Sequence, residues 1–179
     1  MAAFQSKTEM YTADKLVESA GTILFRLSTR EVCVLHSLQH DEYVLPKGRR
    51  NLGESRQDTA LRETIEETGV PCYLLPIDLV SRVCPTIGTE DVPDEPRLFK
   101  SSREPIAMQQ RQIGDGEIKL IWWFVAAVDE KEVLRQYEKH KFEVEFHSYY
   151  EVLQKLTFED DCELVKQAIH LVDAAIEHS

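Results

Sequence analysis

The chain has 179 residues, 42% apolar and 30% charged, with a net charge of −11. This composition fits one globular domain, 1–179, and so strong a negative charge disfavours nucleic-acid polymers and anionic membranes as partners. No apolar run is long enough to span a bilayer. The four cysteines form no C-x-x-C pair, which disfavours a zinc knuckle and favours reduced thiols in the cytoplasm, or export if a leader preceded this numbering.

The first half of the chain alternates apolar strands with turn residues. Residues 17–27 and 31–37 are rich in β-branched and aliphatic side chains and predict an antiparallel pair. Residues 42–46 predict a short third strand that ends at Pro46. A polar loop follows, over residues 47–54.

A helix is predicted next, from Ser55 to about Thr68. Ser55 with Asp58 three residues later has the form of a capping box, and Gly69 stands where a left-handed residue ends a helix. The apolar residues on its predicted buried side are Ala60, Leu61, Ile65 and Val70.

The second half predicts more strands and ends in helices. Residues 72–84 predict a strand interrupted at Pro76, and the acidic, proline-bearing residues 85–103 predict a long loop. Residues 105–113 and 117–128 predict a hairpin around a Gly-Asp-Gly turn. A short strand and an amphipathic helix complete the chain. The simplest fold class that accommodates these elements is α/β (α+β), an α/β/α sandwich with a mixed sheet.

Three carboxylates, Glu63, Glu66 and Glu67, crowd the C-terminal half of the predicted helix. Like charges three and four residues apart repel by roughly 0.2–0.5 kcal/mol per pair, and acids there oppose the helix dipole. Oxygen ligands of this kind suit Mg²⁺, or Mn²⁺, which would turn the repulsion into attraction. Arg62 can pair with one of these carboxylates and orient it. The alternative is a solvated acidic face.

The wider spacing is more specific than the acids alone. Residues 48–70, GRRNLGESRQDTALRETIEETGV, place Gly48, Glu54, Arg62 and the three glutamates in the pattern G-x5-E-x7-R-E-x2-E-E-x-G. This resembles the box of the Nudix hydrolases, with Thr64 where that family usually has an aliphatic residue. The resemblance covers 23 residues closely and the surrounding elements loosely.

The resemblance implies a fold, a reaction and a set of site residues. It implies an α/β/α sandwich with a catalytic loop-helix-loop, and hydrolysis of a pyrophosphate linkage by a metal-activated water. Glu63, Glu66 and Glu67 would bind the cation, with the Gly48 carbonyl completing the coordination. The general base is left open between Glu63, Glu67 and Glu117.

The substrate must be read from the flanking residues. Lys47, Arg49 and Arg50 put three cations in four residues, which would attract a highly phosphorylated small molecule. The alternative is an exposed loop that balances the acidic helix. Further candidates to bind substrate are Arg82, Arg103 and Lys119, and Arg97, Lys100 and Arg111 lie on the same stretch.

The sequence is most similar to the diphosphoinositol polyphosphate and diadenosine polyphosphate hydrolases, including fungal ones. Pro85, fifteen residues after Val70, is typical instead of Nudix enzymes for ADP-ribose or nucleotide sugars, although proline is also common where a strand ends.

Trp122, Trp123 and Phe124 either stack on a base or pack in the core, and alternation puts at least one of them inside. A non-catalytic Nudix binding module is the remaining alternative; the oligomeric state stays open.

Overall fold

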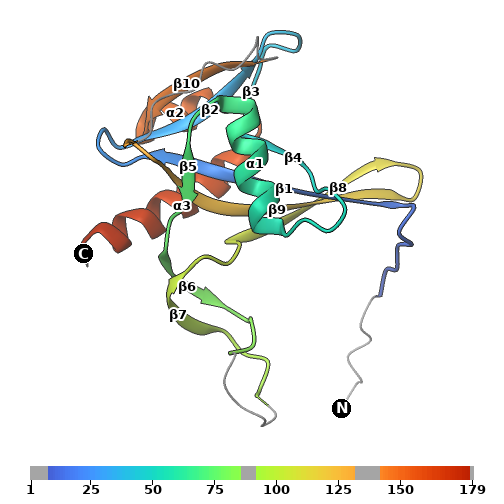
Figure 1. The fold of residues 1–179 in the computed structure, drawn as a ribbon. Coiled ribbons are helices and arrows are strands. Elements are labelled where there is room, and N and C mark those ends of the chain that lie inside the picture. The colour runs from blue at the N-terminus through green and yellow to red at the C-terminus, as the bar shows by residue number, and fades with distance from the viewer. Residues whose placement is uncertain (1–7, 86–91, 132–141, 178–179) are drawn as a thin grey trace.

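The structure is a computed structural model that describes residues 8–85, 92–131 and 142–177. Strands precede and follow one central helix, and two more helices end the chain (Figure 1). The strands are β1 Leu16–Arg26, β2 Glu31–Ser37, β3 Glu42–Val44, β4 Lys47–Arg49, β5 Cys72–Leu74, β6 Ile77–Ser81, β7 Arg97–Ser102, β8 Ala107–Gly114, β9 Glu117–Val128 and β10 Phe142–Ser148. The helices are α1 Arg56–Thr68, α2 Tyr149–Lys155 and α3 Glu159–Glu177.

Eight of these strands form one mixed sheet in the order β10-β2-β1-β9-β5. In addition, β3 pairs with β2, β4 with β1, and β8 with β9. The long central strands β1 and β9 run parallel, and their neighbours are antiparallel. The predicted antiparallel pair 17–27 and 31–37 and the predicted hairpin of β8 and β9 are therefore confirmed.

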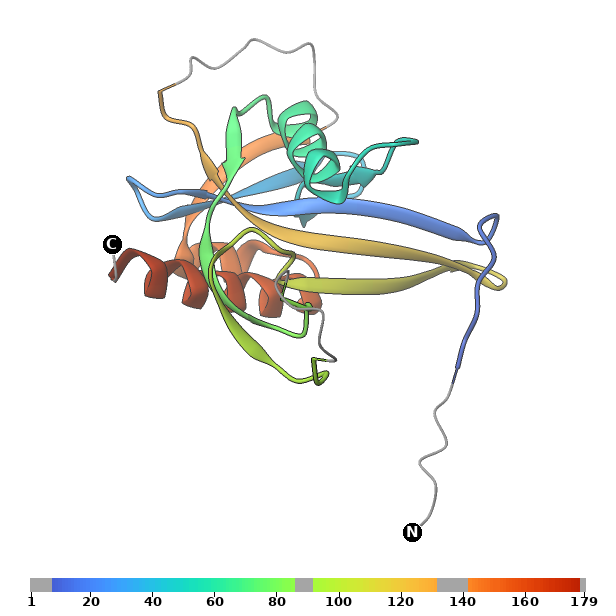
Figure 2. The ribbon, with the colours of Figure 1, turned by 60° about the horizontal axis from the view of Figure 1, so that its bottom comes forward.

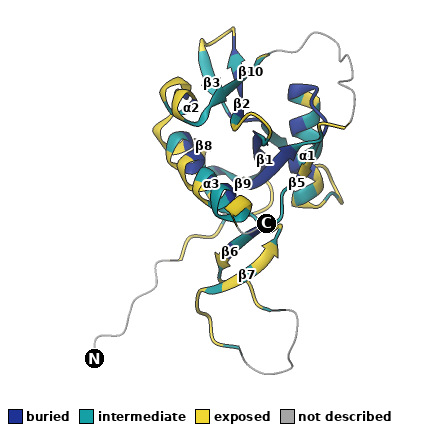
Figure 3. Ribbon diagram, turned by 90° about the vertical axis from the view of Figure 1, so that its left-hand side faces the viewer, coloured by how far each residue is buried: buried dark blue, intermediate teal, exposed yellow. Residues whose placement is uncertain are grey.

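Helices cover both faces of the sheet, as an α/β/α sandwich requires. Figure 2 shows α1 on one side of the sheet and α3 on the other. One core cluster lies between the sheet and helices α2 and α3, and includes Phe25, Trp123 and Val165. The second lies under α1 and includes Leu24, Ala60 and Phe124. Figure 3 shows the buried side of α1 turned toward the sheet. The predicted fold class is confirmed.

One predicted loop is partly wrong. Within 85–103, residues Arg97–Ser102 form β7, which pairs with β6 in a separate two-stranded sheet. The strand begins directly after Pro96, and its short RLFKSS run alternates too briefly to be recognised without its partner. Residues 86–91 of the predicted loop lie outside the described residues.

The predicted helix from Ser55 to Thr68 is confirmed at both ends. The Ser55 side chain accepts a hydrogen bond from the Asp58 amide, and Gly69 adopts φ 70° with its amide bonded to the Ile65 carbonyl. A left-handed φ at this position favours glycine. Among the described helices, none has the length and apolar character to span a membrane.

The predicted apolar side of α1 is wrong in part. The fully buried helix residues are Thr59, Ala60, Thr64 and Thr68, whereas Leu61 and Ile65 are only partly buried. The Thr64 hydroxyl bonds to the Ala60 carbonyl at 2.7 Å and meets the Thr22 hydroxyl of β1 at 2.8 Å. Because each hydroxyl has a partner, threonines can replace aliphatic residues in this contact.

Candidate active site

Helix α1 presents its acidic side to the short strand β4. The backbone amide of Lys47 donates to the Glu67 carboxylate at 2.8 Å. β4 itself is held by β1, with Gly48 opposite Ala20 and Lys47 opposite Gly21. The loop that joins β4 to α1 thus brings the strand backbone against the glutamates of the helix.

Arg62 connects the acidic residues of the loop and the helix. Its guanidinium donates to Glu54 at 2.7 and 3.0 Å, to Glu63 at 2.8 Å and to Glu66 at 3.0 Å. It also donates to the Arg49 carbonyl at 3.0 Å. These bonds to Arg62 hold the pKa of Glu54 down at about 2. One arginine therefore fixes two helical carboxylates and offsets part of their mutual repulsion.

Gly48 provides space for Glu63. A Cβ built on Gly48 would collide with the Glu63 carboxylate, so a larger residue would displace this side chain. The carboxylate is thereby held directly over the backbone of β4. A glycine at this position is required by the close approach and not by the backbone angle.

Glu67 is a partly buried carboxyl group of α1. Burial raises its pKa to about 7, against the opposing effects of the Lys47 amide and ammonium. The neighbouring charges of Glu63 and Glu66 act in the same direction as burial. Burial likewise lowers the pKa of the Lys47 side chain. A partly buried carboxylate among other carboxylates has a strong need for a cation.

The alternation of β4 decides which backbone carbonyls face the glutamates. In an antiparallel ladder, successive residues point their backbone groups alternately toward and away from the partner strand. Pro46 and Arg50 bond to β1, whereas Lys47 and Arg49 bond to side chains of α1. Gly48 therefore faces β1. The predicted carbonyl ligand at Gly48 is not tested by any bound ion, but the strand turns the Lys47 carbonyl toward the helix.

The arrangement fits a hard divalent cation. The donors are carboxylate oxygens of Glu63, Glu66 and Glu67, which suit Mg²⁺ or Mn²⁺. The space that the missing Cβ of Gly48 leaves for Glu63 supports the same conclusion. These residues stay the predicted metal ligands.

Comparison with known proteins identifies the family. The NUDIX domain matches residues 15–167, which is most of the chain. The chain belongs to the Nudix family. Nudix hydrolases act on small phosphorylated substrates and generally use divalent cations, in agreement with the acidic helix described above.

Solved structures support the Nudix fold. C. elegans Ap4A hydrolase in a binary complex is similar with 16% identity and a TM-score of 0.60, covering 88% of this chain and 98% of that one. A NUDIX hydrolase from Nitrosomonas europaea has 15% identity and a TM-score of 0.56, covering 89% and 90%. A UDP-X diphosphatase has 12% identity and a TM-score of 0.52, covering 90% and 66%. At these identities the likeness shows the fold alone; the diphosphoinositol assignment and a fungal source stay predictions.

The structure separates the cations predicted to bind substrate. Arg50 pairs with Glu18 of β1 at 2.8 Å, and Arg49 is exposed. Lys47 and Arg49 are two residues apart on β4, so their side chains share a face, and the Lys47 Cβ lies beside Gly21 on that face. Arg50 is therefore separated from Lys47 and Arg49, and only Lys47 is partly buried next to a Nudix glutamate.

The other predicted cations are also dispersed. Arg82 lies just beyond β6 and pairs with Asp94 at 3.1 Å, and Arg103 is exposed after β7, where its carbonyl accepts from Gln57. Lys119 of β9 lies opposite Arg111 of β8. Neither Arg82 nor Arg103 contacts the acidic side of α1 within the described residues.

The aromatic run divides between core and surface. Trp123 and Phe124 are 1% and 2% exposed, so core packing is confirmed for both. Trp122 lines a cavity of about 450 Å³ with Ser55, Gln57 and Phe124. Its indole donates to Glu18 at 2.9 Å, and the Arg56 guanidinium lies 3.9 Å from its ring centroid. The sequence did not indicate this contact, because Glu18 is far away along the chain.

Glu117 lies far from the glutamates of α1. It begins β9 and pairs with Lys15 at 3.1 Å. Six residues separate it from Trp123, which lies beside Gly21 and Lys47. At about 3.3 Å per residue this places Glu117 roughly 20 Å away along the strand. The geometry therefore disfavours Glu117 as a general base.

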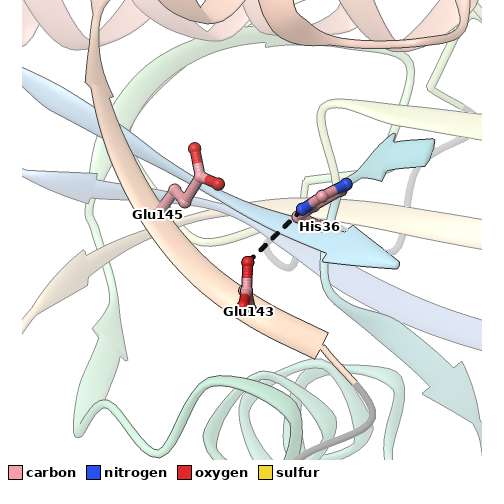
Figure 4. Close-up of side chains that lie close together, drawn as sticks. All are labelled: His36, Glu143 and Glu145. Atoms are coloured by element: carbon pink, nitrogen blue, oxygen red, sulfur yellow. Dashed lines mark ion pairs between the residues drawn. The ribbon is translucent and has the colours of Figure 1, made fainter. Parts of the chain in front are cut away.

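A second group of metal-ligating side chains lies on the β2–β10 edge of the sheet. Within the described residues, ligand atoms of His36, Glu143 and Glu145 lie within 4.8 Å of one another (Figure 4). Each already has a partner in the protein: His36 bonds to Asp41 at 2.8 Å, and Glu145 to His147 at 2.6 Å. This group is distinct from the Nudix glutamates and is explained by these ion pairs.

Proposed function

We propose that the protein is a Mg²⁺-dependent hydrolase of a pyrophosphate linkage in a highly phosphorylated small molecule. The preferred substrates are diphosphoinositol polyphosphates and diadenosine polyphosphates. The observation that carries the proposal is the convergence of Glu63 and Glu67 on the backbone of β4, with Arg62 bound to Glu54, Glu63 and Glu66. A non-catalytic binding module would not need this complete set of charged Nudix residues.

The residues have separable roles. Glu63, Glu66 and Glu67 would hold the cation, which neutralises substrate phosphates and lowers the pKa of a water when bound. Arg62 is a positioning residue, because it fixes the rotamers of Glu63 and Glu66 from the side.

Glu63 and Glu67 are the two candidates on α1 to accept the proton of the attacking water. Arg62 already occupies an oxygen of Glu63, whereas Glu67 receives a neutral amide from Lys47. One oxygen of each carboxylate, Oε2 of Glu63 and Oε1 of Glu67, has no hydrogen-bond partner among the described residues. General-base catalysis requires a carboxylate oxygen that the cation does not occupy, so the base is whichever of these two glutamates leaves its free oxygen to the water.

Turnover of three substrates tests the proposal. Diphosphoinositol pentakisphosphate, diadenosine tetraphosphate and ADP-ribose are compared with Mg²⁺, each with the wild type and Glu67→Gln. We expect kcat/KM to be highest for one of the first two and to fall at least 100-fold in the variant. A preference for ADP-ribose would instead favour Pro85 as the guide to substrate. Wild-type rates in Glu67→Gln would overturn the metal and base assignment.

A further inference from the structure

Lys47, Lys119 and Arg111 lie on the α3 side of the sheet, behind the acidic side of α1. The Lys47 side chain leaves β4 on this side, because a Cβ on Gly21 would contact both Lys47 and Trp123, and Trp123 packs in the α3 core. Lys119 lies four residues before Trp123 on β9, hence on the same face. Arg111 is opposite Lys119 across the β8–β9 pair and shares that face.

Electrostatic effects show that these groups are neighbours. Besides burial, the charges that act on the Lys47 ammonium are those of Glu67, Arg111, Asp161 and Lys119. Lys47 thus connects the Nudix glutamate Glu67, through its amide, with the cations of β8 and β9, through its side chain. The carboxylates beside Arg111 are Asp161 and, through the 3.4 Å hydrogen bond that its Oδ2 accepts from Gln109, Asp160.

Arg111 is held in place with part of its guanidinium free. Its Nε and Nη2 atoms donate to Gln109 Oε1 at 3.2 and 2.9 Å, and Nη2 lies 3.6 Å from Asp161 Oδ1. Phe158 lies 6.0 Å from the guanidinium carbon. Within the described part of the chain, Nη1 has no hydrogen-bond partner. The side chain is 35% exposed, so this amino group is accessible.

Asp161 supplies the second, independent observation. It is 2% exposed in the first turn of α3, and its Oδ1 has no hydrogen-bond partner among the described residues. A buried carboxylate that lacks full pairing is costly and needs an explanation. Its closest cation is Arg111, so its position is explained if it orients that guanidinium for a ligand.

We propose that Arg111, together with Lys47 and Lys119, binds the phosphoryl groups of the substrate that lie beyond the scissile linkage, and that Asp161 positions Arg111. This inference rests on the proposed function, because it assigns the reaction to the adjacent Glu63–Glu67 side of α1. It moves substrate selection from Arg50 to the β8–β9 hairpin and to the side of β4 that carries Lys47. The ligand class is a polyphosphate chain or ring with several adjacent phosphates. A guanidinium suits such a ligand because it can donate two parallel hydrogen bonds to one phosphate.

Steady-state kinetics with long and short substrates tests the subsite. Arg111→Ala should raise KM for diadenosine tetraphosphate at least tenfold, with kcat changed less than threefold and KM for ADP-ribose changed less than threefold. Arg111→Lys should recover only part of this loss. Arg82→Ala removes a cation from outside the site and is the matched control. Equal effects of Arg111→Ala and Arg82→Ala would overturn the subsite.

A double variant tests the positioning role. Asp161→Asn should raise KM for the tetraphosphate and leave kcat unchanged, and adding it to Arg111→Ala should cause no further rise. A loss of kcat with both substrates, added to that of Arg111→Ala, would mean that Asp161 only maintains the fold.

A binding measurement separates this inference from the proposed function. Inorganic tripolyphosphate is titrated into Glu67→Gln protein by calorimetry, with chelator present, with and without Arg111→Ala. A tenfold weaker affinity in the double variant supports the subsite even if the wild type hydrolyses none of the substrates, in which case the proposed function alone fails. Unchanged affinity in an active enzyme overturns the subsite alone.

Discussion

Replacing Glu67 by glutamine should stabilise the metal-free protein while it abolishes turnover. Burial raises the pKa of Glu67 to about 7 from its ordinary value of 4.5. The folded protein therefore binds this proton more tightly than the unfolded chain does. The contribution of Glu67 to the free energy of unfolding is fully present below pH 4.5, and it is lost as the pH rises to about 7. Glutamine is neutral at every pH and keeps an oxygen for the Lys47 amide.

The magnitude follows from the gap between the two pKa values. At about 1.4 kcal/mol per pKa unit, ionising Glu67 costs the folded state about 3 kcal/mol above pH 7. Most of this cost develops between pH 5 and pH 8. Glu67→Gln should therefore unfold at higher denaturant concentration than the wild type at pH 8, and by a much smaller margin at pH 5.

Urea unfolding with chelator at pH 5, 6, 7 and 8 measures this difference. Glu66→Gln is the matched control, because it removes a charge from the same side of α1 at a side chain that is 55% exposed. We expect the control to change the free energy of unfolding by less than about 1 kcal/mol. A difference between Glu67→Gln and wild type that is the same at pH 5 and pH 8 would refute the reasoning from burial.

Three further predictions concern the surroundings of this carboxylate. Gly48→Ala should displace Glu63, lower turnover about 100-fold and remove the rise in melting temperature caused by Mg²⁺; wild-type values of both would contradict the close approach. Arg62→Lys should lower the free energy of unfolding, measured in urea, by about 1–3 kcal/mol, because a lysine cannot donate hydrogen bonds to Glu54 and Glu63 together. An unchanged free energy would mean that the hydrogen bonds of Arg62 do not contribute to stability. Thr64→Val should lower the free energy of unfolding by about 1–3 kcal/mol in the same measurement and leave KM unchanged. Adding Thr22→Val should restore much of that free energy, because neither hydroxyl is then left without its partner; no restoration would argue against the hydroxyl pair.

The sequence by itself determined the parts of this protein that depend on local spacing. Ser55 and Gly69 delimit α1, and the helical period puts Glu63 and Glu67 on one side, with Arg62 and Glu66 beside them. The mixed sheet and the β8–β9 hairpin were likewise predicted from alternation and turn residues. These features need only near neighbours in the chain, so a pattern of residue types is sufficient to predict them.

The tertiary structure alone decided how the charges are combined. Arg50 is neutralised by Glu18, and Lys47 turns to the α3 side, so these two cations of one short loop separate. Arg111 and Asp161, fifty residues apart, come together only because β8 and α3 meet on one face of the sheet. Burial of Glu67 depends in the same way on the strand that covers it. Pairing and desolvation depend on the order of strands in the sheet, which no local pattern of residues specifies.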